Sequence, residues 1–202
     1  MSNKEIQEQR VRAYFIQATK EILSGEGLRN VSVRNIAERA GYSYATLYNY
    51  FKDLKDLIFE CVKDFQVECE EHVQRETNNS ARGKEKVKAI VKAYVKYFVQ
   101  YPGIFDLFFL EKINDVGSKQ ATIDLICTFL DRLCADEWDY CVSKKIVSAD
   151  IAVIKRNQIT YTIAGLLLLY INRRYPSAYK DFASTVEVQL DAIIYGTGPN
   201  KM

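Results

Sequence analysis

The sequence has few of the residues that break helices or that build metal and enzyme sites. Its 202 residues include three prolines, nine glycines and a single histidine, His72. So few helix breakers favour long helices. One histidine without any CxxC pair argues against a zinc site, and no nucleophile–base pair or phosphate-binding loop is recognisable. We therefore expect no enzyme activity, no metal and no cofactor.

Long hydrophobic runs are also absent. The longest one extends only from Ile163 to Tyr170, well short of the about 20 residues that a membrane helix needs. The first residues include Lys4, Glu5 and Glu8, so no apolar signal segment opens the chain. These observations predict a cytoplasmic protein that does not contact a membrane.

The five cysteines are an odd number, which argues against a disulfide framework in a cytosolic chain. Cys127, Cys134 and Cys141 recur every seven residues. On one helix such positions lie about 10.5 Å apart, beyond the about 7 Å that a disulfide spans. We expect them to be small apolar residues on a buried stripe.

Helical periodicity extends along the whole chain, and no alternating pattern indicates a sheet. A first helix carries the apolar stripe Val11, Phe15, Ala18 and Ile22. Further helices are predicted over residues 33–40, 44–50, 53–74, 84–100, 104–113, 120–142, 148–173 and 178–195, with loops at 77–80 and 114–118. The predicted fold class is all-α.

Two short helices near the N-terminus have the spacing of a helix-turn-helix. Ser32 is a good N-cap for residues 33–40, Gly41 suits a left-handed C-terminal cap, and Ser43 can cap residues 44–50. The second helix of such a motif enters the major groove with its N-terminal end, where small and polar side chains read bases. Residues 1–55 also hold nine basic and six acidic residues, which suits a nucleic-acid partner.

The stretch VSVRNIAERAGYSYATLYNYFKDLKDLI resembles the N-terminal signature of the TetR family of regulators, over roughly residues 10–60. The resemblance implies a homodimer whose N-terminal domains bind a palindromic operator and whose larger C-terminal domain binds a small-molecule effector and dimerises. We expect a DNA-binding domain over 1–60, with its recognition unit at 32–51, and an effector and dimerisation domain over 61–202. The positions that match the family's DNA contacts are Ser32, Arg34, Ser43, Tyr44, Ala45, Thr46, Tyr48, Asn49 and Tyr50.

Two positions depart from the family pattern. Leu54 stands where the family usually has a lysine that meets phosphate, so Lys52 or Lys55 would have to supply that charge. Asn49 stands where the family often has an aromatic residue or histidine. The leading hypothesis is a ligand-responsive repressor. The alternative is a protein-binding coactivator on the same scaffold, with lost or altered operator binding.

The effector half is rich in aromatic residues, which suit an apolar cavity with a few polar groups. The candidates for its lining are Phe65, Tyr94, Tyr97, Phe98, Phe105, Phe108, Phe109, Trp138 and Tyr161.

Two apolar stripes near the C-terminus predict a homodimer interface within residues 149–195. One comprises Thr160, Ala164, Leu167, Leu168 and Ile171, and the other comprises Val186, Leu190, Ile193 and Ile194.

Overall fold

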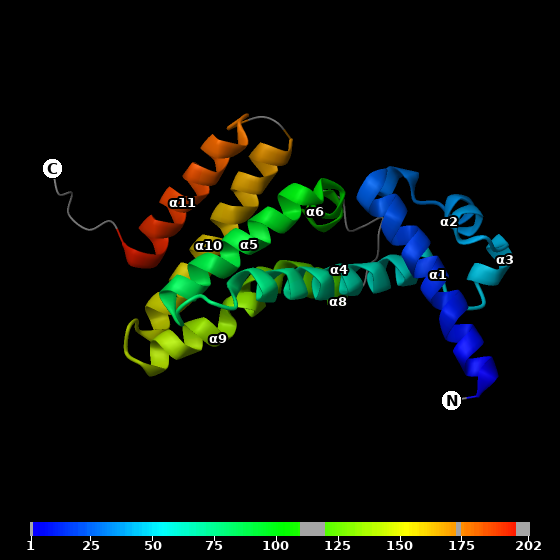
Figure 1. Cartoon of the computed structure of the whole chain (residues 1–202), viewed down its shortest axis with the longest axis horizontal. Coiled ribbons are helices and arrows are strands. Elements are labelled where there is room, and N and C mark those ends of the chain that lie inside the picture. The colour runs from blue at the N-terminus through cyan, green and yellow to red at the C-terminus, as the bar shows by residue number, and fades with distance from the viewer. Residues whose placement is uncertain (1, 110–119, 173–174, 197–202) are drawn as a thin grey trace. The chain divides into compact units, whose positions relative to one another are not determined.

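The computed structural model describes residues 2–109, 120–172 and 175–196 (Figure 1). Within these ranges the regular structure is entirely helical, which confirms the all-α prediction. The elements are α1 (Asn3–Gly25), η1 (Leu28–Asn30), α2 (Val33–Ala40), α3 (Tyr44–Leu47), α4 (Leu54–Thr77), α5 (Lys84–Gln100), α6 (Pro102–Phe109), α8 (Gln120–Cys127), α9 (Phe129–Ser143), α10 (Ala149–Ile171) and α11 (Tyr179–Tyr195). None of the described helices is long and apolar enough to cross a membrane.

The helices group into two compact units, and each unit draws on separate parts of the sequence. The first unit comprises Met1–Val67 and Tyr101–Ile126, and the second comprises Glu68–Gln100 and Cys127–Met202. Helix α4 is continuous, so its residues belong to both units. The functional division at residue 60 concerns which residues bind DNA and which bind an effector, and it stays a prediction.

Helix α1 organises the first unit. Its stripe Val11, Phe15, Ala18 and Ile22 is buried, as the periodicity predicts, and α2 and α6 pack against it. Gly103 of α6 allows the backbones of α6 and α1 to approach closely. A Cβ added at Gly103 would lie 2.5 Å from the backbone oxygen of Leu23 in α1. Only a glycine allows this approach of two backbones.

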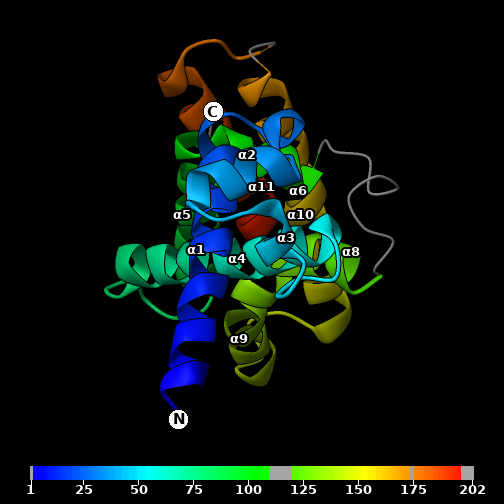
Figure 2. The same ribbon diagram turned by 90° about the vertical axis from the view of Figure 1, so that its right-hand side faces the viewer.

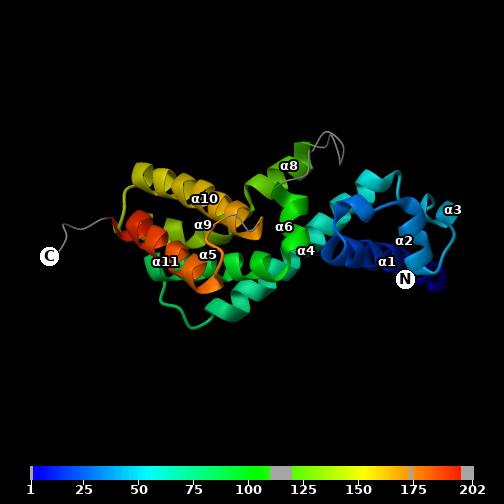
Figure 3. The same ribbon diagram turned by 90° about the horizontal axis from the view of Figure 1, so that it is seen from above.

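The second unit is built from α5, α9, α10, α11 and the second half of α4 (Figure 3). Its largest fully buried side chain is Trp138. The two stripes predicted for the dimer interface contribute to this core, because Leu167, Val186, Leu190 and Ile194 are all buried within the chain. That part of the interface prediction is wrong: α10 and α11 turn these residues toward each other and toward α5.

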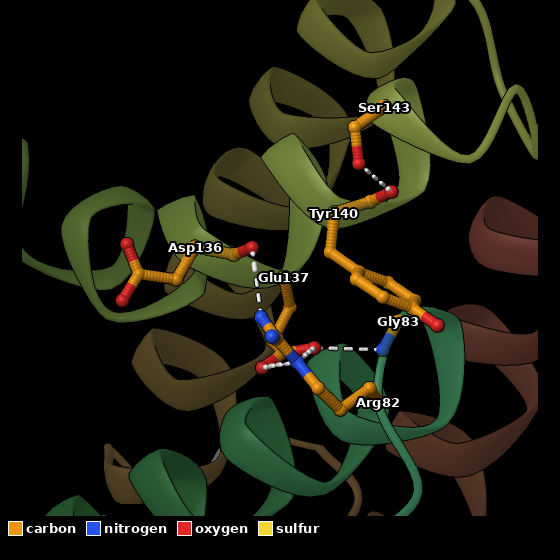
Figure 4. Close-up of polar contacts among 6 residues, drawn as sticks. All are labelled: Arg82, Gly83, Asp136, Glu137, Tyr140 and Ser143. Carbon is orange, nitrogen blue, oxygen red and sulfur yellow. Dashed lines mark hydrogen bonds and ion pairs between the residues drawn. The ribbon is translucent and has the colours of Figure 1, made fainter.

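A buried carboxylate joins the start of α5 to α9 in the second unit (Figure 4). Glu137 accepts hydrogen bonds from the backbone N–H of Gly83 at 2.7 Å and from Arg82 Nε at 3.1 Å. The Arg82 guanidinium also lies over the Tyr140 ring, 4.6 Å from its centroid. The backbone of Gly83 has φ +84°, and an added Cβ would lie 3.2 Å from Cys141 Sγ.

Several predicted boundaries differ from the structure. The predicted helix over 120–142 is divided into α8 and α9, and Cys127, at the end of α8, is exposed while Cys134 and Cys141 are buried. The stripe of three buried cysteines is thus wrong for Cys127, because the helix is not continuous there. Residues 110–113 of a predicted helix, the predicted loop at 114–118 and Arg173 lie outside the described residues.

Candidate nucleic-acid interface

Helix α2 and the turn after it follow the capping pattern that the sequence predicts. Ser32 Oγ accepts the backbone N–H of Asn35 at 3.2 Å, which satisfies a free donor at the start of α2. Gly41 ends α2 in the left-handed conformation, with φ 75° and ψ 25°. In this region a residue with a Cβ is strained, so the glycine sets the direction in which the chain enters the turn.

Helix α3 is the candidate recognition helix. Ser43 Oγ accepts the backbone N–H of Thr46 at 3.2 Å and lies 2.9 Å from Thr46 Oγ1. The regular helix covers only Tyr44–Leu47, shorter than the predicted 44–50. After it, Asn49 N–H donates to Thr46 O and Tyr50 N–H to Leu47 O, bonds that tighten the last turn.

Apolar contacts hold the buried side of this short helix. Leu47 and Phe51 are buried, and the Phe51 ring lies edge-on to Phe15 with their centroids 6.5 Å apart. The Tyr50 ring also packs on Phe15, with the ring centroids 6.2 Å apart, so this ring contributes to the core of the unit. The outer side of α3 is therefore supported by packed apolar and aromatic side chains, as suits a helix that is predicted to read bases.

The predicted DNA-contact side chains all remain at least partly accessible. Tyr44 and Tyr48 are 68% and 53% exposed, high values for aromatic residues. Exposed as well are Arg34, Ser43, Ala45, Asn49 and Lys52, whereas Ser32, Thr46, Tyr50 and Lys55 are half-buried. The structure thus brings these residues to the α2–α3 region without burying any of them. Their contacts with DNA stay predictions.

The start of α4 shows how the chain accommodates Leu54. Asp53 Oδ1 accepts the backbone N–H of Asp56 at 2.8 Å, which caps the start of α4. Leu54 is half-buried, while Lys52, just before the cap, is exposed. Among the predicted substitutes for the usual lysine, Lys52 is therefore more accessible than Lys55.

Ion pairs stabilise the same unit. Arg39 Nη2 lies 2.6 Å from Glu26 Oε1, which ties the end of α2 to the C-terminal cap of α1. Arg12 lies 3.2 Å from Glu60 and its guanidinium stacks over the Phe51 ring. Arg34 has no ion pair within the described ranges, so its charge remains available to a phosphate.

Comparisons with known proteins agree with this geometry. Residues 15–61 match the family described as bacterial regulatory proteins, tetR family. The N-terminal part of the chain is therefore similar to this family of regulators. This match agrees with the resemblance to TetR-family regulators that the helix-turn-helix residues carry.

A curated relative is the fatty acid metabolism regulator protein of Bacillus subtilis strain 168. It is 27% identical over 77 residues, which are 38% of this chain and 40% of the relative. The sequence match therefore spans about two-fifths of that protein.

Two solved structures of regulators share the fold. One is the transcriptional regulator FadR from Bacillus subtilis in complex with stearoyl-CoA, with 17% identity, a TM-score of 0.72, and coverage of 92% of this chain and 99% of that chain. The other is the fatty acid degradation regulator FadR from Bacillus halodurans, with 16% identity, a TM-score of 0.71, and coverage of 94% and 97%. At these identities the likeness shows a common fold.

The predicted effector residues are distributed over both units. In the first unit, Phe65, Phe105 and Phe108 are buried, and Phe109 is half-buried and stacks on Phe105 at 4.7 Å. In the second unit, Tyr94, Tyr97, Phe98 and Trp138 are buried. The Tyr94 ring contacts Phe98 at 4.7 Å and Phe129 at 5.9 Å, and burial raises the pKa of the Tyr94 hydroxyl well above its usual value.

Tyr161 does not line the interior with the others. Its side chain is 75% exposed, because it projects from the side of α10 opposite the buried Ile159 and Ile163. The prediction that it lines the effector cavity is therefore wrong for the single chain.

The second unit also has an open groove of about 570 Å³ beside α5 and α11. Three of its lining residues are lysines, and each is paired: Lys88 and Lys92 with Glu187 at 2.7 and 2.6 Å, and Lys96 with Glu76 at 2.9 Å. The hydrogen bonds from Lys88 and Lys92 lower the pKa of Glu187 to about 2. The groove is thus a charge-balanced surface, unlike the aromatic cavity that the sequence predicts.

Proposed function

We propose that this protein is a homodimeric repressor that binds a palindromic operator through α3 and releases it when an effector binds. The observation that carries the proposal is the recognition surface of the first unit. There a serine-capped helix carries the exposed Tyr44 and Tyr48 on a base fixed by Phe15 and Phe51. Small and polar residues at the start of α3 would read bases, and the hydroxyls of Tyr48 and Tyr50 would bond phosphates.

A seam along α10 supports the dimer. The residues Ile151, Ile154, Gln158, Tyr161, Gly165 and Leu168 recur at alternating spacings of three and four, and we call them the α10 seam. Ile154 is 52% exposed and Leu168 is 39% exposed, while nothing lies within 4 Å of a Cβ added at Gly165. Because the opposite side of α10 is buried in the chain, the helix is apolar on both sides, as expected of a helix that also packs against a second copy.

A fatty acyl-CoA is the effector that we propose. The support is the likeness along nearly the whole chain to a regulator solved with stearoyl-CoA, together with the curated relative in fatty acid metabolism. Aromatic residues are concentrated in both units, and α4 is one continuous helix with residues in each. Tilting of α4 on ligand binding is the proposed link between effector and operator. Such coupling is reciprocal, so the operator must weaken effector binding by the same factor.

The experiment selects an operator from a random-sequence duplex pool and follows binding by fluorescence anisotropy. We expect a palindromic consensus, two chains per duplex, and release of the duplex on adding stearoyl-CoA but not free coenzyme A. Selection of no sequence would overturn operator binding. Selection of an operator that stearoyl-CoA leaves bound would overturn only the acyl-CoA effector.

A coactivator on the same scaffold is the second candidate, and Leu54 is the observation that favours it. Without the usual lysine, phosphate binding rests on Lys52 and Lys55. A coactivator would select no duplex, and its DNA affinity would not change in a Lys52→Ala variant. A repressor should lose affinity in this variant on every duplex tested.

A further inference from the structure

One side of α1 in the first unit has no role in the helix-turn-helix or in the core. The residues Asn3, Gln7, Arg10 and Tyr14 follow each other at spacings of four, three and four, so they lie on one side of the helix, which we call the α1 face. All four are exposed, and Tyr14 is 54% exposed. Polar hydrogen-bonding groups and one cation make up this face, and it contains no acidic residue.

The α1 face adjoins the turn between α2 and α3. The Tyr14 ring stacks on Tyr42, with the centroids 6.2 Å apart and the planes at 28°. Tyr42 directly precedes Ser43, the N-cap of α3, and its own ring packs at 5.5 Å on the buried Phe15. Tyr14 is therefore held beside the N-terminal end of α3. From there α1 continues past α2 and α3 toward its N-terminus (Figure 2).

The charges on this half of α1 leave the face cationic. Glu5 is occupied by the capping box, where its side chain accepts the backbone N–H of Ser2 at 2.8 Å. Glu8 pairs with Lys4 at 4.0 Å on another side of the helix. Arg10 makes no ion pair with any residue that the structure describes. Its guanidinium is thus free for an anion that approaches along the α1 face.

We propose that the α1 face binds the phosphate backbone of DNA beyond the groove that α3 enters. From Asn3 to Tyr14 the helix extends about 16 Å, comparable with about five base-pair steps of a DNA strand. Arg10 would pair with one phosphate and the Tyr14 hydroxyl would donate to another. Contacts of this kind set position and affinity without reading sequence. The inference rests on the proposed operator binding and enlarges its footprint on each half-site.

The test compares Arg10→Ala and Tyr14→Phe with the unmodified protein, on the selected operator and on a random-sequence duplex, over a range of potassium chloride concentrations. Loss of one phosphate contact should reduce the slope of log affinity against log salt by about 0.9 for Arg10→Ala. Affinity should fall about tenfold for Arg10→Ala and about threefold for Tyr14→Phe, equally on both duplexes. Tyr14→Phe keeps the stack on Tyr42, so an unchanged melting temperature separates lost contact from lost folding.

Arg75→Ala is the matched control, because Arg75 is an exposed arginine on α4 in the second unit. It should leave both affinity and salt slope unchanged. If Tyr48→Phe weakens binding while Arg10→Ala and Tyr14→Phe do not, the α1 face is not part of the interface and this inference is overturned. If the unmodified protein binds neither duplex, the proposed function is overturned together with it.

Discussion

The Glu137 carboxylate accepts the backbone N–H of Gly83 at 2.7 Å although only 6% of Glu137 is exposed. The same carboxylate receives Arg82, so one buried charge serves both the start of α5 and the loop before it. A buried charge is tolerated only when it is paired and hydrogen-bonded, and here both conditions are met. Glu137 is therefore a structural residue of the second unit.

Replacing Glu137 with alanine should destabilise the fold. The Gly83 N–H would lose its acceptor and Arg82 its partner, which should cost about 1–3 kcal/mol of unfolding free energy. Urea denaturation followed by circular dichroism measures this. Glu71→Ala is the matched control, because Glu71 pairs with Arg75 at 3.8 Å on an exposed surface, where such a pair contributes about 0–1 kcal/mol. Equal losses in the two variants would contradict the role of Glu137.

Two variants in the α3 region should have different effects, one on affinity for DNA and the other on sequence preference. Tyr48→Phe removes one exposed hydroxyl, and we expect about 1–3 kcal/mol weaker binding, similar on every operator variant. Thr46→Val keeps the side-chain shape but removes a hydroxyl near the N-cap of α3, which is proposed to enter the groove, so the ranking of operator variants should change. Anisotropy titrations at fixed salt measure both. An unchanged ranking would remove Thr46 from the base-reading residues.

The α10 seam gives a prediction for the dimer. Leu168→Glu places a charge at an exposed seam position and should convert the dimer to a folded monomer at micromolar concentration. Leu167→Glu, one residue earlier, buries an unpaired charge in the core of the chain and should unfold it instead. Light scattering gives the mass and circular dichroism the helicity. A Leu168→Glu protein that remains dimeric would place the interface elsewhere.

Stability should depend on pH through His72, the single histidine of the chain. Its Nε2 is buried without a hydrogen-bond partner among the described residues. Burial lowers the pKa of His72, which Glu76 opposes, while Lys96 and Arg75 lower it further. The folded state therefore binds the proton less readily than the unfolded chain. The contribution of neutral His72 to the free energy of unfolding is fully present above about pH 6.5, and it is lost as the pH falls below that value.

The His72→Gln variant should lose this pH dependence. Urea unfolding measured between about pH 5 and pH 7.5 should give a flat midpoint for the variant and a declining one for the natural protein at the acidic end. Proton resonances of the imidazole report the pKa directly. A pKa above that of an unstructured histidine would reverse the sign and refute the prediction.

Much of the fold follows from local patterns in the sequence. The stripe on α1, the serine caps and Gly41 depend on neighbouring residues only, and all of them have the predicted geometry. The burial predictions are wrong where a helix has two apolar sides and only one of them packs against the rest of the chain. On α10, Leu167 and Leu168 are equally hydrophobic and adjacent, yet one is buried and the other is exposed. Periodicity shows that such a helix has apolar sides but not which side meets α5.

The sequence pattern alone does not predict the α1 face. Tyr14 precedes a core residue, Phe15, and only the stack on Tyr42 shows that it belongs beside α3. Tyr161 shows the opposite problem: an aromatic residue in an apolar helix suggests an interior position, whereas the structure exposes it. Both positions depend on contacts between segments distant in sequence.

The close approach of Gly103 to the Leu23 backbone has a consequence for protein engineering. Because α6 completes the packing around the last turns of α1, the unit that carries the candidate recognition helix α3 is discontinuous in sequence. A chimera that transfers only residues 1–67 to another regulator would leave the buried face of Ile22 and Leu23 without its α6 neighbours. A transferable DNA-binding module from this protein must therefore include the residues of α6, or be given a recipient helix with a glycine at the equivalent position.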